Sequence, residues 1–218
     1  MHSIPRPRRE QIAAAILRDL RPLVEPGRVV ELRALDAVTT GHRSPHVVSG
    51  YYDDLPALAR DAAELDGRCR GIYVTLNPVA PALLARAANR IRSPGRDSTT
   101  GDSDVSHRTL LLVDLDPVRP GGISATEEEH GAALARAREV RDRLSAQGWP
   151  APVLADSGNG AHLLYRVDLP ADAESAVLIP QVLRALHLLH SDQAVAVDTS
   201  VGNPARIRRL YCTMTCKG

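Results

Sequence analysis

The chain has 218 residues, 44% of them hydrophobic and 24% charged, which is the balance of an ordinary soluble protein with one large or two small domains. A net charge of +1 excludes nucleic-acid binding through overall charge alone, so such binding would need local basic clusters. No stretch is long enough for a membrane span, three cysteines give no paired framework, and the N-terminus lacks an apolar signal core. We therefore expect a cytoplasmic protein with reduced thiols and no membrane partner.

The first part of the chain predicts an α/β unit. Apolar periodicity and turn residues predict a helix over 9–20, strands over 29–35 and 46–52, a helix over 53–65, a strand over 71–76 and a helix over 81–91. Residues 93–107 have no periodicity and are rich in turn formers, which indicates a surface loop. We expect a subdomain boundary there, with an N-terminal unit and loop over 1–107 and a second subdomain over 108–218.

The second part alternates strand, helix, strand, strand, helix, strand. The strands are expected at 110–116, 153–155, 162–167 and 194–197, with helices from a cap at Ser124 or Thr126 to about 147 and over 174–190, and a further strand from 207. This order predicts an α+β fold with an RRM-like sheet that carries helices on one face. The apolar stripe of the last helix is expected in the core, and it comprises Val177, Leu178, Val182, Leu183, Leu186 and Leu189.

Two carboxylates end the apolar run Leu-Leu-Leu-Val-Asp-Leu-Asp over 110–116. Side chains two apart on a strand share a face, so Asp114 and Asp116 should project together while Leu115 packs on the other side. Two such carboxylates repel each other unless a cation or a proton lies between them, and Mg²⁺ prefers oxygen ligands of this kind. Asp198 follows a short apolar strand in the same manner and is a candidate third ligand.

A glycine-rich turn, Asp-Ser-Gly-Asn-Gly-Ala-His over 156–162, separates two predicted strands. Its glycines allow backbone N–H groups to approach a ligand closely, and Ser157 and His162 are able to donate to phosphate oxygens. The alternative is a plain β-hairpin whose Asn-Gly turn needs positive φ, with a histidine that only packs.

Taken together, these segments resemble the three motifs of the archaeo-eukaryotic primase superfamily, the prim-pol fold. The motifs are the strand-end Asp-x-Asp, the Ser-Gly-Asn-Gly-Ala-His turn, and a strand-end Asp198 that leads into Ala-Arg-Ile-Arg-Arg-Leu-Tyr-Cys-Thr-Met-Thr-Cys-Lys. The resemblance covers about residues 71–218. The chain departs from the family at Tyr211-Cys212, where Pro-Gly is frequent, and at Thr215, where Asn is frequent. Because family members commonly continue beyond this motif, the sequence is expected to be one module of a longer protein.

The resemblance implies a DNA primase or DNA-directed polymerase that transfers nucleotides by two Mg²⁺ or Mn²⁺ ions. It implies that Asp114, Asp116 and Asp198 are the catalytic metal ligands, that Ser157, Asn159, His162, Arg209 and Lys217 bind the nucleotide, and that Arg206 and Arg208 bind nucleic acid. The implied partners are a single-stranded DNA template and ribo- or deoxyribonucleoside triphosphates, with further domains or protein partners. The sequence leaves the biological setting open between plasmid or phage replication, repair and a CRISPR-associated system.

Two other functions stay open at this stage. One is a non-catalytic RRM-like module that binds single-stranded nucleic acid without metal. The other is a phosphohydrolase with Asp114 as nucleophile, which is disfavoured because Asp116 is followed by Pro117 instead of the usual small hydroxyl pair. Separately, Cys212 and Cys216, or His187 and His190, have spacings found in zinc sites, although the two pairs lie on different elements.

Overall fold

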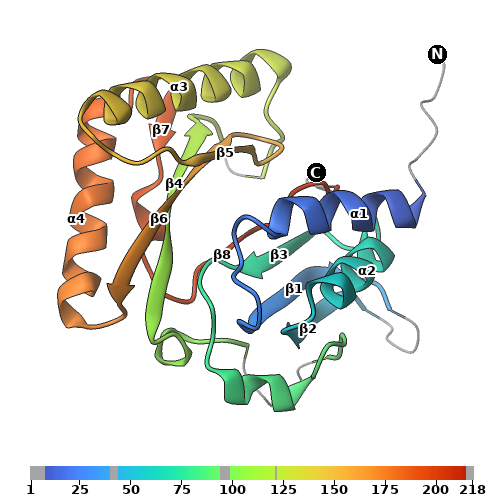
Figure 1. Ribbon diagram of the computed structural model, residues 1–218. Helices are drawn as coiled ribbons and strands as arrows, with labels where there is room; N and C mark the ends of the chain where they lie inside the picture. Colours follow the sequence, from blue (N-terminus) through green and yellow to red (C-terminus); the bar gives the residue numbers. More distant parts are fainter. Residues whose placement is uncertain (1–7, 40–43, 94–98, 121, 215–218) are drawn as a thin grey trace, which may run out of the picture. The chain divides into compact units, whose positions relative to one another are not determined.

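The computed structural model describes residues 8–39, 44–93, 99–120 and 122–214. The chain forms two compact units (Figure 1). Of the described residues, unit 1 holds those in 1–75, 79–100 and 207–216, and unit 2 holds those in 76–78 and 101–206. The boundary therefore falls at Thr100 instead of residue 107. The segment from Ile207, which we expected in the second subdomain, belongs to unit 1.

Unit 1 is a four-stranded antiparallel sheet with two α-helices, in the strand order β2-β1-β3-β8. Its elements are α1 (Arg9–Leu20), β1 (Val30–Ala37), β2 (His46–Tyr52), α2 (Leu55–Leu65), β3 (Gly71–Thr75), the 3₁₀ helix η1 (Pro81–Arg86) and β8 (Ile207–Arg209). The predicted helix over 9–20 and the strand over 46–52 are confirmed at both ends. The core of the unit contains Ile16 and Leu20 of α1, Leu58 of α2, and Leu32 and Ile72 of the sheet.

The helix predicted over 81–91 is wrong beyond Arg86. Only a 3₁₀ helix forms, and the chain then pairs with the edge strand β2. Tyr51 donates its N–H to Ala87 and accepts from Asn89, while Ser49 exchanges both backbone hydrogen bonds with Arg92. An edge strand leaves backbone groups unpaired, and this segment satisfies them at the expense of its own helical bonds.

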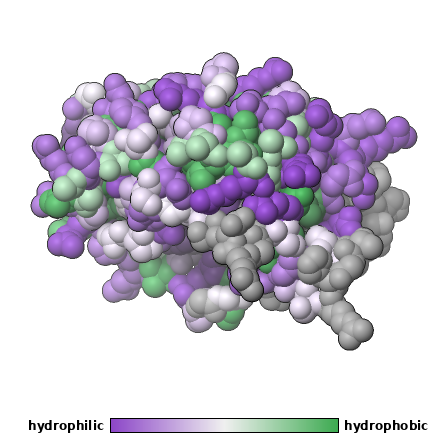
Figure 2. Space-filling view, turned by 90° about the horizontal axis from the view of Figure 1, so that it is seen from below, coloured by the Kyte–Doolittle hydropathy of each residue, from purple (hydrophilic) through white to green (hydrophobic). Residues whose placement is uncertain are grey.

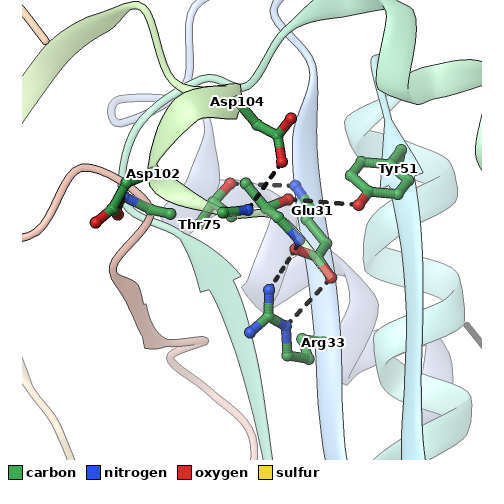
Figure 3. Close-up of polar contacts among 9 residues, drawn as sticks. Glu31, Arg33, Tyr51, Thr75, Asp102 and Asp104 are labelled. Carbon is green, nitrogen blue, oxygen red and sulfur yellow. Dashed lines mark hydrogen bonds and ion pairs between the residues drawn. The ribbon is translucent and has the colours of Figure 1, made fainter. Parts of the chain in front are cut away.

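A fully buried acid, Glu31, lies on β1 in the middle of unit 1 (Figure 3). Its two carboxylate oxygens accept from Arg33, at 3.2 Å from Nε and 2.6 Å from Nη2, and Oε2 also accepts from the N–H of Thr100 at 3.1 Å. The N–H of Glu31 donates to Thr75 Oγ1. A buried charge is tolerated when its hydrogen bonds are made within the protein, as they are here.

Unit 2 contains the second four-stranded antiparallel sheet, in the order β5-β6-β4-β7. Its elements are the 3₁₀ helix η2 (Asp102–Asp104), β4 (His107–Pro117), α3 (Glu127–Ala146), β5 (Val153–Asp156), β6 (Ala161–Pro170), α4 (Ala173–His190), β7 (Val195–Val197) and the 3₁₀ helix η3 (Thr199–Val201). Both strand-helix-strand crossovers are expected to be right-handed, which puts α3 and α4 on the same face of the sheet. The α+β prediction and its RRM-like strand order are confirmed.

Local chemistry explains where the helices of unit 2 begin. Thr126 and Glu129 form a capping box at the start of α3, with Thr126 Oγ1 accepting from the Glu129 N–H and Glu129 accepting from the Thr126 N–H. Asp172 caps α4 by accepting from the N–H of Ser175 at 2.9 Å. These caps satisfy N–H groups that have no partner within the helix.

The apolar stripe expected on α4 is only partly in the core. Leu183 and Leu186 are buried, but Val177, Leu178 and Leu189 are 58%, 42% and 68% exposed. The helix has apolar residues around most of its circumference, so periodicity alone does not identify the buried face.

Hydrophilic side chains cover most of the face seen in Figure 2, and the apolar residues on it form small separate areas. Among the described residues, none of the helices combines the length and the apolar character that crossing a bilayer requires.

Candidate active site

The acidic end of β4 lies between β6 and β7 in unit 2. Asp114 is directly opposite His162 of β6, and on the other side its C=O accepts from the N–H of Asp198 at 2.8 Å. Directly opposed residues of neighbouring strands project from the same face of a sheet. Asp114, His162 and Asp198 therefore share one face across three strands, and Asp116 joins them because it lies two residues along β4.

The other face of this sheet is apolar. Val113 and Leu115 of β4 and Leu163 of β6 are fully buried and alternate with the polar residues. Tyr165, on the same alternation as Leu163, contacts Trp149 edge to face with ring centroids 5.1 Å apart. Trp149 follows α3 and donates its N–H to Leu144 of that helix, so this apolar face is the one that the helices cover.

The Asp114 carboxylate is the centre of the site. Its Oδ1 lies 3.4 Å from Nε2 of His162, and the two side chains are 18% and 5% exposed. That oxygen is buried and has no hydrogen-bond partner among the described residues. Leaving a buried carboxylate oxygen without a hydrogen bond is costly. Such an oxygen fits a position where a cation binds.

Asp116 lies against the backbone of Gly160, the residue before β6. A Cβ atom on Gly160 would be 2.6 Å from Asp116 Oδ1 and 2.4 Å from the Leu115 carbonyl oxygen. Real Cβ contacts do not come this close, so glycine is required here for the close approach of β4 and not for an unusual φ.

Asp198 is held by the start of η3 as well as by its bond to β4. Its carboxylate accepts from Ser200, at 2.7 Å from the N–H and 3.0 Å from Oγ. Ser200 Oγ in turn accepts from Nη2 of Arg206 at 3.2 Å. Arg206, half-buried, is thereby linked to the third acid of the predicted site.

The glycine-rich turn is a hairpin between β5 and β6, and several of its polar groups are already used. Ser157 Oγ accepts from the N–H of Gly160 at 3.0 Å, and Gly158 has a φ of 89°. Asn159 is buried, and its Oδ1 accepts from the N–H of Ala125, just before α3. Asn159 therefore anchors the entry to α3.

Sequence reasoning missed the partner of the residue that opens this turn. Asp156 Oδ1 lies 2.9 Å from Nε2 of His130 on α3, and it also accepts from the N–H of Gly158 at 2.7 Å. A histidine on a helix surface gives no signal of its own, because only the fold brings it to a residue 26 positions away.

The other C-terminal arginines belong to unit 1, and their side chains lie inside it instead of on its surface. Arg208 is 2% exposed and lies over the Tyr211 ring, 5.1 Å from its centroid. Arg209 donates from Nη2 to the Thr213 carbonyl at 2.7 Å and lies over Tyr73. Burial lowers the pKa of both guanidinium groups from their ordinary value. Arg208, to which the resemblance assigns nucleic-acid binding, is therefore buried within unit 1.

Cys212, which replaces a glycine frequent in the resembled family, has a φ of 63°. This is the left-handed region that favours glycine. Its thiol donates to Asp19 at 3.1 Å, and desolvation, with the nearby Asp19 carboxylate, raises the thiol pKa to about 11. A raised pKa disfavours the thiolate that zinc binds. Cys216 and Lys217 lie outside the described residues.

Within the described ranges, no three His, Cys, Asp or Glu side chains are gathered closely enough to hold a metal ion as they stand. Strand register puts Asp114, Asp116, His162 and Asp198 on one face of the sheet, but their side chains do not converge on one point.

Comparisons with known proteins identify no family for this chain. No protein-family model and no curated protein matches it. One solved structure similar to the chain is the polymerase domain of Mycobacterium tuberculosis Ligase D in complex with DNA, with a TM-score of 0.49 and 18% identity over 92% of this chain and 74% of that one. A similarity of this extent does not establish a shared family or activity.

Proposed function

We propose that the protein is a metal-dependent nucleotidyltransferase that extends a nucleic-acid strand on a single-stranded template, a primase-polymerase. The observation that supports this most is the register of β4 with β6 and β7, because it puts Asp114, Asp116, His162 and Asp198 on one face of one sheet. The same residues carry the prim-pol resemblance of the sequence.

The side chains of this face suit a divalent cation by their chemistry and not by their present spacing. Asp114 Oδ1 is buried without a hydrogen-bond partner among the described residues, and carboxylate oxygens are the ligands that Mg²⁺ and Mn²⁺ prefer. Asp114, Asp116 and Asp198 would hold the metal. When bound, two such ions activate the attacking hydroxyl and stabilise the charge on the transferred phosphoryl group and the leaving pyrophosphate.

The other residues bind and orient the substrates. His162 lies beside Asp114 and, as a donor, neutralises charge on the triphosphate. Ser157 at the turn adds a hydroxyl. Arg206, which is linked through Ser200 to Asp198, is suited to a phosphate of the template. Arg209 and Lys217 stay assigned to the nucleotide only by the resemblance.

The RRM-like strand order also fits a module that binds single-stranded nucleic acid without catalysis. Such modules stack bases on aromatic side chains of the open sheet face. In unit 2 the aromatic residue of β6, Tyr165, is on the opposite, helix-covered face and is buried. The face that carries Asp114 presents carboxylates in place of aromatic rings, and carboxylates repel nucleic acid unless a metal is bound.

The test is incorporation of nucleotides on primed and unprimed single-stranded DNA with Mg²⁺ and with Mn²⁺. Asp114→Asn keeps the shape of the side chain and removes its charge. We expect this variant to lose about 100-fold or more of the incorporation rate, because loss of even outer partners of metal ligands costs about 10- to 100-fold.

The matched control is Asp142→Asn, the same substitution at an exposed position of α3. We expect it to leave incorporation unchanged. If the wild-type protein binds DNA but incorporates no nucleotide with either metal, the catalytic proposal is wrong and the binding module takes its place. Product on the unprimed template would identify the protein as a primase.

A further inference from the structure

The strand that leads to Asp198 is short and needs support from outside the sheet. β7 has three residues, Val195–Val197, and lies at the edge of its sheet next to β4. Edge strands this short have few ladder hydrogen bonds to fix them. The position of Asp198 therefore depends on what else holds the end of β7.

Two polar side chains at the C-terminal end of α4 bind the last residue of β7, Val197. His187 Nδ1 lies 2.8 Å from the carbonyl oxygen of Val197, and Ser191 Oγ accepts from the N–H of Val197 at 2.9 Å. His187 Nδ1 and Ser191 Oγ are 3.1 Å apart. A carbonyl oxygen only accepts, so Nδ1 carries the proton and donates. Both backbone polar groups of Val197 are thus bound by α4.

Ser191 is itself fixed to the helix. It is the C-cap residue of α4, and its N–H donates to the His187 carbonyl at 2.9 Å. The two side chains and the backbone bond form a closed clamp on one residue, Val197, directly before Asp198. Asp198 then donates its N–H to Asp114 at 2.8 Å. The clamped residue, Val197, is therefore directly followed by the third acid of the site, Asp198.

We propose that His187 and Ser191 are positioning residues that set the backbone from which the Asp198 carboxylate reaches the metal. This inference rests on the proposed function. Apolar contacts from α4 would be enough to cover β7, whereas hydrogen bonds to the N–H and the C=O of Val197 fix the peptide planes on both sides of it and so the direction of the next side chain. The clamp acts on metal binding through Asp198 and touches neither metal nor substrate.

The experiment measures binding of Mn²⁺ alone to the whole chain, from the free-ion electron paramagnetic resonance signal, alongside the Mn²⁺ and nucleotide dependence of incorporation. Ser191→Ala and His187→Ala remove the two side-chain bonds. We expect each to raise the Mn²⁺ concentration for half-saturation about tenfold, the cost typical of losing an outer partner of a metal ligand. The KM for nucleotide should stay unchanged because the clamp does not contact it.

Conservative replacements and an adjacent control separate positioning from general damage. Ser191→Thr keeps the hydroxyl and His187→Asn keeps an N–H donor near the Nδ1 position, so both should return to within about twofold of the wild-type half-saturation, well inside the outer-partner effect. Leu188→Ala alters a 76% exposed side chain in the same turn and should change neither metal binding nor incorporation.

The outcomes distinguish this inference from the proposed function. If the wild-type protein binds Mn²⁺ and incorporates nucleotide, and the Ser191 and His187 variants match Leu188→Ala, the clamp does not position Asp198 and the catalytic proposal stands. The same conclusion follows if those variants lose thermal stability but keep the wild-type Mn²⁺ half-saturation. If the wild-type protein neither binds Mn²⁺ nor incorporates nucleotide, both proposals fail.

Discussion

Each of the two sheets has an acid on an inner strand with a buried carboxylate oxygen, and the two acids differ in their hydrogen-bond partners. Glu31 of unit 1 has both carboxylate oxygens hydrogen-bonded to Arg33, and one of them also to the Thr100 N–H. Asp114 of unit 2 has a histidine 3.4 Å away but an Oδ1 with no hydrogen bond among the described residues. The fold thus supplies hydrogen bonds to both oxygens of the carboxylate in unit 1, and it leaves one oxygen of the carboxylate in unit 2 without a hydrogen bond among the described residues.

This difference gives a criterion for deciding whether a buried charged group stabilises the fold or serves a function. When partners of the fold already satisfy a charge, its removal damages the fold. When the fold leaves the charge unsatisfied, an external cation or substrate is the remaining partner. The predictions below test the comparison at residues of both kinds.

The largest effect on folding is expected at Glu31. In Glu31→Met, Arg33 loses its partner while it is largely buried, and removing one member of a buried pair costs about 3–5 kcal/mol of unfolding free energy. The double variant Glu31→Met, Arg33→Met leaves no unpaired charge and should recover most of that loss. Urea unfolding of the three proteins measures the effect, and equal stability of the single variant and the wild type would contradict the comparison.

A smaller cost to folding, with a clear cost to activity, is expected for Gly160→Ala. The added Cβ meets the Leu115 carbonyl and Asp116 Oδ1, so β4 or the turn must shift at a cost of about 1–3 kcal/mol, and Asp116 moves with it.

Gly131→Ala on α3 is the matched control, because nothing lies within 4 Å of its Cβ position. Alanine is the better helix former there, by up to about 1 kcal/mol. Thermal unfolding and nucleotide incorporation are measured for both variants. A Gly160→Ala protein with wild-type incorporation would show that Asp116 does not need its present position.

The smallest effect is expected at Asp192, an acid that is satisfied by the protein but exposed. Bonds from the Val195 and Ala194 N–H groups and then the Arg136 side chain lower its pKa from 3.8 to about 2. Because the folded pKa is the lower one, its contribution is present above pH 4 and is lost as the pH falls through about 2.

The thermal midpoint of Asp192→Asn, followed from pH 6 to pH 2, should therefore lie below that of the wild type at pH 6 and approach it in acid. If the difference in thermal midpoint between the two proteins did not change with pH, the charge of Asp192 would not contribute to stability.

Much of the fold could be predicted where the signal is local. The helix at Arg9–Leu20 shows a regular apolar stripe, and of the two caps expected for α3, Ser124 and Thr126, the structure uses Thr126. Asp114 and Asp116 are candidate site residues from the sequence because two acids at the end of an apolar strand repel each other unless a cation or a proton lies between them. The order of the elements in unit 2 was enough for its RRM-like topology.

What could not be predicted depends on partners distant in sequence. Residues 87–92 have helical composition, yet they pair with β2 because its edge offers backbone groups. β8 joins β3, with Tyr73 opposite Arg209, and the side chains of Arg208 and Arg209 are buried on opposite faces of this strand pair. The sequence gives no sign that Tyr211 and Tyr73 lie against the guanidinium groups of these two arginines.

The return of β8 to the first sheet has a consequence for synthesis of the protein on the ribosome. β3 pairs with β8 at one edge of its sheet, and β8 is synthesised only after more than a hundred further residues. All four strands of unit 2 are synthesised before β8. Domains generally fold as units as the chain emerges. The sheet that begins first is therefore completed last, and until then the Gly71–Thr75 edge presents unpaired backbone to any neighbouring strand.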